Sequence, residues 1–535
     1  MKLSKNYSAI LILAIFVSFL QAATPNWSID FEKKIKWEKL TSTGHLVVST
    51  DGGLYGINPD DGSIAWKMEE IKKLNEEMFE LIPFTPYAIV NTGKGLFSVL
   101  NRMTVINVAD GKEIWSSDEL DINSSMGQFI LPEMNALFIY GTNSKGKTKV
   151  TVVEVDTGKL IWEDVDFFKK RNAVVFPMTK VKQTIVGNQE PLFDTPETMI
   201  TFLDNKGLRK HNAKTGELIW DCEFKKTHAP ALLRGYSPMF FDGENKVVYV
   251  PSLNKIIAVK TDDGAKVWKK SEKLKGMVQQ IALTPQGLLV KTGGGSDGKS
   301  GKPSIVLLNT ETGKKAWKKE FKKLKNSTNF VVKDDKVLVY SDKKIYSINL
   351  SDGKYEEVAK KLKFKGGEYP YGLTLREDGL FLQSSQNLML LDFNGEQKFH
   401  SHFKAPGSSM FAKIASTAAI MAVNAMSVAS AHSRAQTNAY NNGGRGSAEY
   451  SLINSNPYIS KRFKASKDAA NFTYILTEVK NDDEKGPGIV KVNKITGEKE
   501  KGIVLGEKEP VYEIDEIDGR IFFKSDKKQI QCFKF

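Results

Sequence analysis

Residues Gly293–Ser300 (GGGSDGKS) fit the phosphate-binding pattern G-x-x-x-x-G-K-[ST], and Gly294–Gly298 also fits the nucleophile pattern G-x-S-x-G. Both chemistries need a helix directly after the loop, to aim backbone N–H groups at phosphate or to hold a strained serine. Here Pro303 and the apolar run Ser304–Leu308 follow, which is typical of a strand. The segment is therefore predicted to be a flexible hairpin loop without catalytic function.

Two further sets of polar residues are of types that can bind a metal or act as acid and base. His400 and His402 alternate on a predicted strand and so share one face, as metal ligands do, but no third histidine lies at ligand spacing. The acidic pairs Asp60-Asp61 and Asp262-Asp263 fall in predicted turns, where Asp bonds its own backbone. These features are interpreted as structural, and neither a metal nor a catalytic site is predicted.

The chain has two cysteines, Cys222 and Cys532. One pair so far apart in sequence is not a disulfide framework, and whether the two thiols pair stays open.

These residues lie in a sequence that repeats one short motif about every 50 residues, and the repeat predicts the strands that position them. Each copy has Thr or Asp, then Gly, three further residues and Trp. The six complete copies are Gly62 with Trp66, Gly111 with Trp115, Gly158 with Trp162, Gly216 with Trp220, Gly264 with Trp268, and Gly313 with Trp317.

One repeat predicts a four-stranded antiparallel sheet. The residues before each glycine form apolar, β-branched runs such as Lys255–Val259, and the glycine suits a left-handed position in a hairpin loop. The tryptophan then falls on the return strand at a fixed offset, where its large ring suits a wedge between adjacent repeats. Two more short strands fit between copies, so each repeat is predicted to be a propeller blade.

This repeat resembles that of the PQQ-like β-propellers, which include the quinoprotein alcohol dehydrogenases and the outer-membrane assembly lipoprotein BamB. The resemblance implies an all-β propeller over residues 24–404 and 471–535. Eight blades are usual in that group. A literal count of nine turns, including the decayed copies at Gly353, Gly395 and Gly497, plus one blade formed by the two ends of the chain, gives ten.

The two ends of the propeller are predicted to complete each other. Trp27 and Phe31 repeat the spacing of Trp220 and Phe224, so the N-terminal segment looks like a return strand with no hairpin before it. The C-terminal run 529–535, which contains Cys532, looks like a strand without its return strand. We expect the two to pair and close the ring, which removes an open sheet edge.

An insertion is predicted over residues 405–470. Its first part, Met410–Ala435, is expected to form an amphipathic helix whose apolar, small-residue side includes Met421 and lies near Met426. Packing against the propeller and docking to a partner or membrane surface both stay open. The Gly- and Asn-rich run 441–446 is predicted to be a mobile loop.

Residues 1–22 are predicted to be a secretory signal, because Lys2 and Lys5 precede the apolar run Ala9–Leu20 and small residues follow. We expect an exported protein of the periplasm or outer-membrane surface. No cysteine follows the apolar run, so lipid attachment of the BamB type is not expected.

The net charge is +14 and most basic residues are lysines. Lysine pairs follow the Trp strands, and the connections after those strands would all lie on one face of the disc. The resulting basic face could bind anionic lipid, polysaccharide or an acidic protein, although exposed lysines also discourage sheet-to-sheet association. The candidate partner surface comprises Lys169, Lys170, Lys225, Lys226, Lys318, Lys319, Met421 and Met426. Nucleic-acid binding is not expected, since no recognised motif is present.

The function predicted from these features is a non-enzymatic interaction scaffold with a protein partner in the cell envelope and no cofactor. Outer-membrane protein assembly is its most concrete form, implied by the resemblance to BamB. The resemblance also implies an alternative, a dehydrogenase dependent on PQQ and Ca²⁺, but the adjacent cysteines and the CxxCH haem motif of such enzymes do not occur here. A secreted propeller that binds anionic polymers is the third hypothesis.

Overall fold

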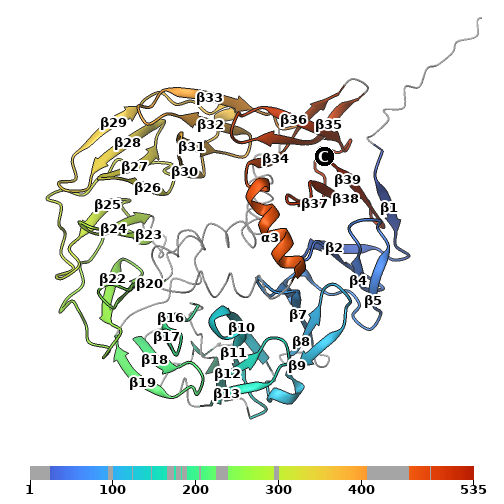
Figure 1. Cartoon of the computed structure of the whole chain (residues 1–535), viewed down its shortest axis with the longest axis horizontal. Coiled ribbons are helices and arrows are strands. Elements are labelled where there is room, and N and C mark those ends of the chain that lie inside the picture. The colour runs from blue at the N-terminus through green and yellow to red at the C-terminus, as the bar shows by residue number, and fades with distance from the viewer. Residues whose placement is uncertain are drawn as a thin grey trace, which may run out of the picture.

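Ten antiparallel sheets stand around a central axis in a closed ring (Figure 1). This computed structural model describes residues 24–93, 101–122, 124–145, 147–165, 174–175, 182–183, 190–203, 207–224, 239–293, 301–406, 457–481 and 484–535. Among these residues ten sheets have three or four strands and form blades, so the literal count of ten is confirmed over the usual eight. We number the blades 1 to 10 in chain order.

Blades 1 to 4 each have four strands, ordered from the innermost to the outermost strand. Blade 1 comprises β2 (Ile35–Leu40), β3 (Leu46–Thr50), β4 (Gly53–Ile57) and β5 (Ile64–Met68); blade 2 comprises β6 (Phe79–Leu81), β7 (Tyr87–Gly93), β8 (Asn101–Asn107) and β9 (Glu113–Ser116). Blade 3 comprises β10 (Ser124–Leu131), β11 (Ala136–Thr142), β12 (Thr148–Glu154) and β13 (Leu160–Asp164); blade 4 comprises β16 (Leu192–Thr195), β17 (Thr198–Leu203), β18 (Gly207–Asn212) and β19 (Leu218–Glu223).

Blades 5 to 7 continue the ring. Blade 5 comprises β20 (Phe240–Asp242), β21 (Val247–Ser252) and β22 (Lys255–Lys260); blade 6 comprises β23 (Met277–Thr284), β24 (Gly287–Gly293) and β25 (Ile305–Leu308); blade 7 comprises β26 (Phe330–Lys333), β27 (Lys336–Ser341), β28 (Lys344–Asn349) and β29 (Tyr355–Ala359). In blades 5 and 6 the outermost segment forms isolated bridges only, such as Val259 with Lys266 and Ile305 with Phe321.

Blades 8 to 10 complete the ring. Blade 8 comprises β30 (Gly372–Arg376), β31 (Gly379–Gln383), β32 (Asn387–Leu391) and β33 (Gln397–His402); blade 9 comprises β34 (Phe472–Lys480), β35 (Lys485–Asn493) and β36 (Lys499–Val504); blade 10 comprises β37 (Tyr512–Asp515), β38 (Arg520–Asp526), β39 (Gln529–Lys534) and β1 (Trp27–Asp30). Outside the blades lie the pair β14 (Val174–Val175) and β15 (Lys182–Gln183), helix α3 (Pro457–Ala469), and the 3₁₀ turns η1 (Glu76–Met78), η2 (Ser117–Leu120), η3 (Pro132–Met134) and η5 (Lys365–Gly367).

Blade 10 joins the two ends of the propeller. Its outermost strand β1 pairs antiparallel with β39, with Trp27 opposite Cys532 and Asp30 opposite Gln529. Three strands therefore come from the C-terminal region and one from the N-terminal region (Figure 1). The predicted closure by N- and C-terminal strands is confirmed. It leaves blade 10 held to blade 1 partly by non-covalent strand pairing.

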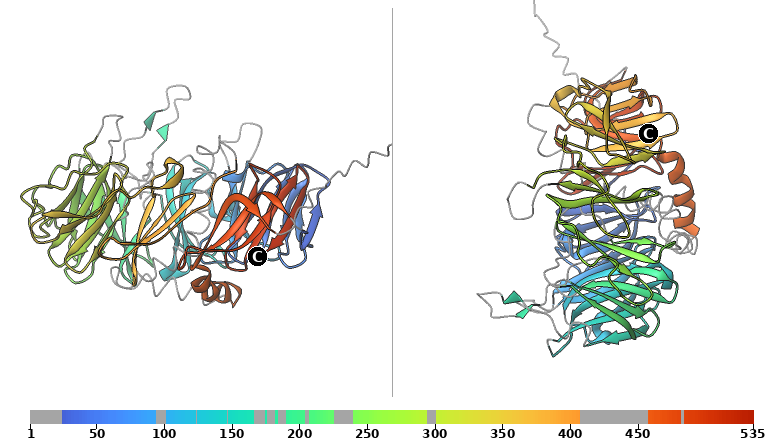
Figure 2. Two further views of the ribbon diagram at one scale, coloured as in Figure 1. Left: turned by 90° about the horizontal axis from the view of Figure 1, so that it is seen from above. Right: turned by 90° about the vertical axis from the view of Figure 1, so that its left-hand side faces the viewer.

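Helix α3 lies within the predicted insertion and against one face of the disc, whereas β14 and β15 project from the other face (Figure 2). The helix expected over Met410–Ala435 and the loop 441–446 lie outside the described residues, as does the predicted signal segment. Within the part of the chain that the structure describes, no helix has the length and apolar character needed to cross a membrane.

Candidate functional site at the ring closure

The repeated tryptophans lie between blades. The indole N–H of each donates to a backbone carbonyl of the next blade, at N···O distances of 2.7–3.0 Å. The donor–acceptor pairs are Trp27 with Pro59, Trp66 with Val108, Trp115 with Val155, Trp162 with Ala213, Trp220 with Thr261, Trp268 with Thr310, and Trp317 with Leu350. A buried indole N–H requires such an acceptor, so the ring is fixed in orientation as well as buried.

The repeated glycines are the other half of this contact. A Cβ atom at Gly111 would lie 2.7 Å from the ring of Trp66, and one at Gly313 would lie 2.4 Å from the ring of Trp268. The turn glycines also have a φ near +70°, for example +71° at Gly111 and +67° at Gly313, which disfavours any side chain. Gly62, Gly158, Gly216, Gly264 and Gly353 meet Trp27, Trp115, Trp162, Trp220 and Trp317 in the same way. We call this arrangement the Trp–Gly contact.

The Trp–Gly contact is replaced at the junctions among blades 7 to 10. Between blades 8 and 9, Phe399 takes the place of the tryptophan and lies against Gly497. Between blades 7 and 8, Gly395 faces the backbone of Val358 instead of an aromatic ring. Between blades 9 and 10, the rings of Tyr474 and Phe535 pack with centroids 5.0 Å apart. We refer to blades 1–7 as the regular arc and to blades 8–10 with α3 as the closing sector.

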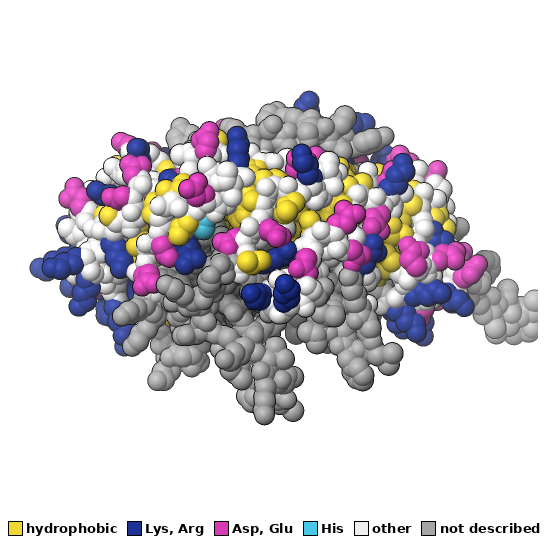
Figure 3. All heavy atoms as spheres, turned by 90° about the horizontal axis from the view of Figure 1, so that it is seen from below, with side chains coloured by type: hydrophobic (Ala, Val, Ile, Leu, Met, Phe, Trp, Pro, Cys, Tyr) yellow, Lys and Arg dark blue, Asp and Glu magenta, His cyan; other side chains and the backbone are white. Residues whose placement is uncertain are grey.

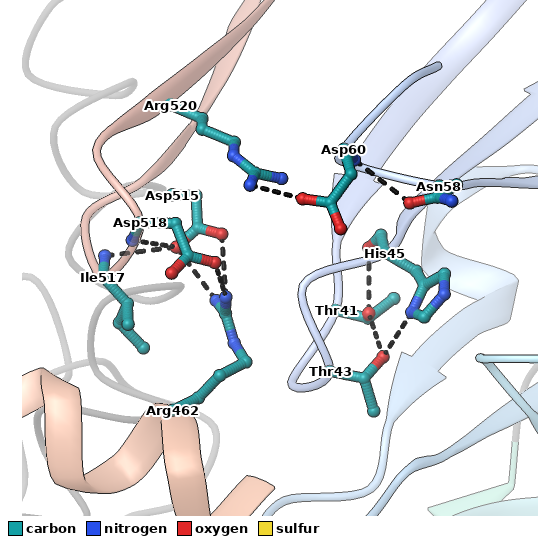
Figure 4. Close-up of polar contacts among 10 residues, drawn as sticks. All are labelled: Thr41, Thr43, His45, Asn58, Asp60, Arg462, Asp515, Ile517, Asp518 and Arg520. Carbon is teal, nitrogen blue, oxygen red and sulfur yellow. Dashed lines mark hydrogen bonds and ion pairs between the residues drawn. The ribbon is translucent and has the colours of Figure 1, made fainter. Parts of the chain in front are cut away.

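Helix α3 is anchored to blade 10 by a buried ion pair (Figure 4). The guanidinium of Arg462 binds both carboxylate oxygens of Asp515 at 2.9 Å and Oδ2 of Asp518 at 2.8 Å. The Arg462 side chain is 11% exposed and that of Asp515 is 1% exposed. Asp515 also accepts the backbone N–H groups of Ile517 and Asp518, which shapes the β37–β38 turn around the guanidinium. Burial lowers the pKa of Arg462, but the two carboxylates raise it above its usual value.

The same helix touches other blades. Nη1 of Arg462 lies 2.8 Å from the position of a Cβ at Gly44, in the β2–β3 turn of blade 1. Ile459, one turn earlier, is buried in the apolar core between blades 2 and 3, with Ile130 and Phe84. Helix α3 therefore spans the junction between blade 10 and blade 1.

Polar side chains surround this junction (Figure 4). Arg520 of blade 10 forms an ion pair with Asp60 in the hairpin turn of blade 1. Nearby, the hydroxyl of Thr43 lies 3.0 Å from Nδ1 of His45. Burial, and then the charge of Arg462, lowers the pKa of His45. These ion pairs link helix α3 to blade 10 and blade 10 to blade 1, although the three elements are distant in sequence. Such contacts hold the helix and the two blades together.

Among the described residues, the histidines considered for metal binding are not brought together with further ligands. Nε2 of His400 lies 3.0 Å from Oδ1 of Asn387, and no group of three or more His, Cys, Asp or Glu side chains among the described residues could hold a metal ion. Cys222 and Cys532 are both buried and unpaired, in blades 4 and 10. After Gly293, residues 294–300 lie outside the described residues, and residues 301–308 lead into strand β25.

The candidate partner surface is described only in part. Lys318 and Lys319 are exposed, while Lys169, Lys170, Lys225, Lys226, Met421 and Met426 lie outside the described residues. One side of the rim shows Lys and Arg side chains interspersed with Asp and Glu (Figure 3). Binding of an anionic surface by the lysines therefore stays a prediction.

The anchor of α3 was missed by sequence reasoning. Arg462 lies in the insertion, beyond the segment where a helix was expected, and Asp515 and Asp518 belong to an ordinary-looking turn. No spacing rule connects an arginine in an insertion to a turn more than fifty residues later. The one available signal was the loss of the Trp repeat in this part of the chain.

Two family models match the sequence. One, described as the EMC1 N-terminal beta-propeller domain, matches residues 179–472, more than half of the chain. The other, described as outer membrane protein assembly factor BamB, matches residues 17–186. No curated protein matches the chain. The predicted resemblance to the PQQ-like β-propellers is thereby confirmed.

Among solved structures, BamB from Moraxella catarrhalis is 14% identical, with 68% of this chain and 94% of that chain covered and a TM-score of 0.33. The quinohemoprotein alcohol dehydrogenase ADHIIG from Pseudomonas putida HK5 is 10% identical, with coverages of 69% and 72% and a TM-score of 0.32. The quinohemoprotein alcohol dehydrogenase from Comamonas testosteroni is 13% identical, with coverages of 65% and 61% and a TM-score of 0.31.

Proposed function

The chain belongs to the family of the EMC1 N-terminal beta-propeller domain, and from this premise we propose that it is a non-enzymatic, exported scaffold. In this proposal it binds a protein partner around α3 and the turns beneath it. The observation that carries the proposal is the anchoring of α3 by Arg462 to Asp515 and Asp518 of blade 10, beside the ring closure. Export rests on the signal-like character of residues 1–22.

The repeated tryptophans and glycines favour a scaffold over an enzyme, because their side chains are already used in packing between blades. Each repeated indole donates its N–H to the next blade and stacks on that blade's glycine. What departs from the repeat is the insertion and the polar closure, so a partner-specific surface is proposed there. Extra segments on a rigid fold are where binding commonly resides.

A quinone cofactor does not fit the residues present. The dehydrogenases that the repeat resembles hold a disulfide between adjacent cysteines beside their cofactor, whereas Cys222 and Cys532 lie in blades 4 and 10. The repeated tryptophans point into blade junctions, where a turn glycine of the next blade already lies against each ring. A dehydrogenase is therefore the less favoured alternative, and addition of PQQ and Ca²⁺ with a reducible dye tests it directly.

A role in outer-membrane protein assembly is the narrower form of the proposal. It rests on the match of residues 17–186 to the model described as an outer membrane protein assembly factor. The longer match, over residues 179–472, gives no support for a role in outer-membrane assembly.

Crosslinking mass spectrometry on the native host extract, with the full chain as bait, tests the scaffold. We expect reproducible crosslinks from one partner to lysines near α3, such as the exposed Lys461 and Lys464. Arg462→Met should reduce them severalfold, because it releases the helix. Arg209→Met is the matched control, since it removes an ion pair with Asp221 on the regular arc. Crosslinks that are absent, or equally reduced by both variants, contradict the proposal.

A further inference from the structure

The innermost strands of the two blades that meet at the closure each carry a glutamate. Glu38 lies on β2 of blade 1 and Glu513 on β37 of blade 10, and these two strands are in contact. The two carboxyl groups are close enough for the charge of Glu38 to raise the pKa of Glu513. An acidic pair therefore lies at the junction beside the ring closure, where β1 is held to β39 by strand pairing and not by a covalent connection.

Glu38 is buried without a counter-ion in direct contact. The residue is 7% exposed, and neither oxygen of its carboxylate has a hydrogen-bond partner among the described residues. A buried carboxylate without a partner costs several kcal/mol, so such a group stays protonated to a higher pH.

The two lysines near the pair contact other groups as well, and they offset the effect of burial on the pair only in part. Nζ of Lys524, on β38, donates to the backbone carbonyl of Ile35 at 3.3 Å, and Nζ of Lys39 lies 3.8 Å from Glu76 of η1. The charge of Lys524 lowers the pKa of Glu38 only in part, while Glu76 raises it. Lys39 and the backbone N–H of Leu40 lower the pKa of Glu513, and Glu76 again raises it.

We propose that Glu38 and Glu513 make the junction between blades 10 and 1 pH-sensitive: it is tight while the carboxyl groups are protonated and loosens when they ionise. The effect is confined to the place where closure depends on the pairing of β1 with β39. A change of pH between compartments would then change how readily the ring opens, without any effect on the junctions of the regular arc.

The direction of the pH dependence follows from the pKa values. Burial, the largest cause, raises the pKa of Glu38 to about 7 and that of Glu513 to about 8. Both values lie above the value of about 4.3 for a solvated glutamate, so the closed junction binds more protons than the open one. The contribution of these two groups to closure is therefore complete below about pH 4.3 and is lost as the pH rises from there through 7 and 8.

The two cysteines of the chain provide the probe. Cys532 lies in the apolar core between blades 10 and 1, and Cys222 lies in the core between blades 4 and 5. Burial raises the pKa of both thiols, to about 12 for Cys532, so each reacts only after its junction opens. The ratio of their labelling rates with N-ethylmaleimide cancels the ordinary pH dependence of thiol reactivity.

For the full chain we expect the ratio of Cys532 to Cys222 labelling to rise at least roughly tenfold between pH 6 and pH 8.5. Glu38→Gln, which mimics the protonated acid at every pH, should clearly reduce this rise, both by removing one of the two acids and by removing the charge that raises the pKa of Glu513. Glu80→Gln is the matched control, because Glu80 is also a glutamate on an innermost strand but belongs to blade 2.

A ratio that does not change with pH in the unaltered chain would overturn the proposal, as would an undiminished rise in Glu38→Gln. Should Glu38→Gln fail to fold, Glu513→Gln carries the same test. The midpoint of thermal unfolding at both pH values gives an independent readout, and Glu38→Gln should raise it at pH 8.5 more than at pH 6.

Discussion

The regular arc and the closing sector solve the same packing problem differently. In the arc, each junction is filled by one indole on one glycine, with the indole N–H satisfied by a backbone carbonyl. In the closing sector, Phe399 lies on Gly497 without an indole N–H, and Phe535 packs on Tyr474. The buried ion pair of Arg462 with Asp515 also anchors a helix outside the blades there. The difference indicates that the arc is a stable support and that the closing sector is the part open to adjustment.

The largest effect should come from removing an indole of the arc. Trp317 is 3% exposed, and Trp317→Ala should lower the free energy of unfolding by about 3–5 kcal/mol, through the lost burial and the cavity left behind. Urea denaturation followed by circular dichroism measures this. Phe399→Ala, in the closing sector, should cost less because Phe399 is only partly buried. A loss below about 1 kcal/mol for Trp317→Ala would contradict the packing role.

The anchor of α3 should give the next largest effect, and a local one. Arg462→Ala leaves Asp515 buried without its cation, a loss of about 3 kcal/mol, so amide exchange in α3 should rise about a hundredfold. The unfolding midpoint of the arc should change little. Hydrogen exchange with mass spectrometry separates the two. If exchange in α3 is unaltered, the ion pair does not hold the helix.

The sequence predicted the regular arc and its closure well, because Trp317, Gly313 and their copies recur at one spacing and Trp27 shares it. It could not predict the anchor of α3, since Arg462 meets Asp515 only through the ring geometry. It also gave no reason to single out Glu38, which follows Trp37 on a strand and becomes distinctive only once β37 is placed beside it. The spacing of Trp and Gly within a repeat is a local pattern and predicts the blades. Contacts between residues distant in sequence, such as Arg462 with Asp515, form only once the ring has closed.

Acid should weaken the arc while it tightens the closure. His211 of blade 4 is 2% exposed, and burial, its largest influence, lowers its pKa to about 4. Since the unfolded chain binds a proton near pH 6.5, stability from this group is lost as pH falls, by about 2 kcal/mol between pH 7 and pH 5. His211→Asn should flatten this acid limb in urea titrations. His402→Gln, in blade 8, should flatten it less, because His402 is only partly buried and burial lowers its pKa too. Equal effects of both variants would show that His211 is not the main cause of the loss of stability in acid.

The smallest expected effect isolates the Trp–Gly contact itself. Gly353 has a φ of +71° and would place a Cβ 2.8 Å from Trp317, whereas Gly367 has a φ of +74° with nothing within 4 Å. Both Ala variants incur the left-handed backbone cost of about 1–2 kcal/mol. Gly353→Ala should cost about 1–2 kcal/mol more, from overpacking against the indole. Equal losses in thermal or urea unfolding would mean that backbone conformation alone requires the glycine.

The most direct test of the contrast between arc and closure is the reactivity of the two native cysteines across a urea titration at one pH. Cys532 reports on the junction between blades 10 and 1, and Cys222 on the junction between blades 4 and 5. We predict that Cys532 becomes reactive at a lower urea concentration than Cys222, because the ring opens first where β1 meets β39. If both thiols become reactive together, at the midpoint of global unfolding, the closure is as firmly held as the arc and the central claim is wrong.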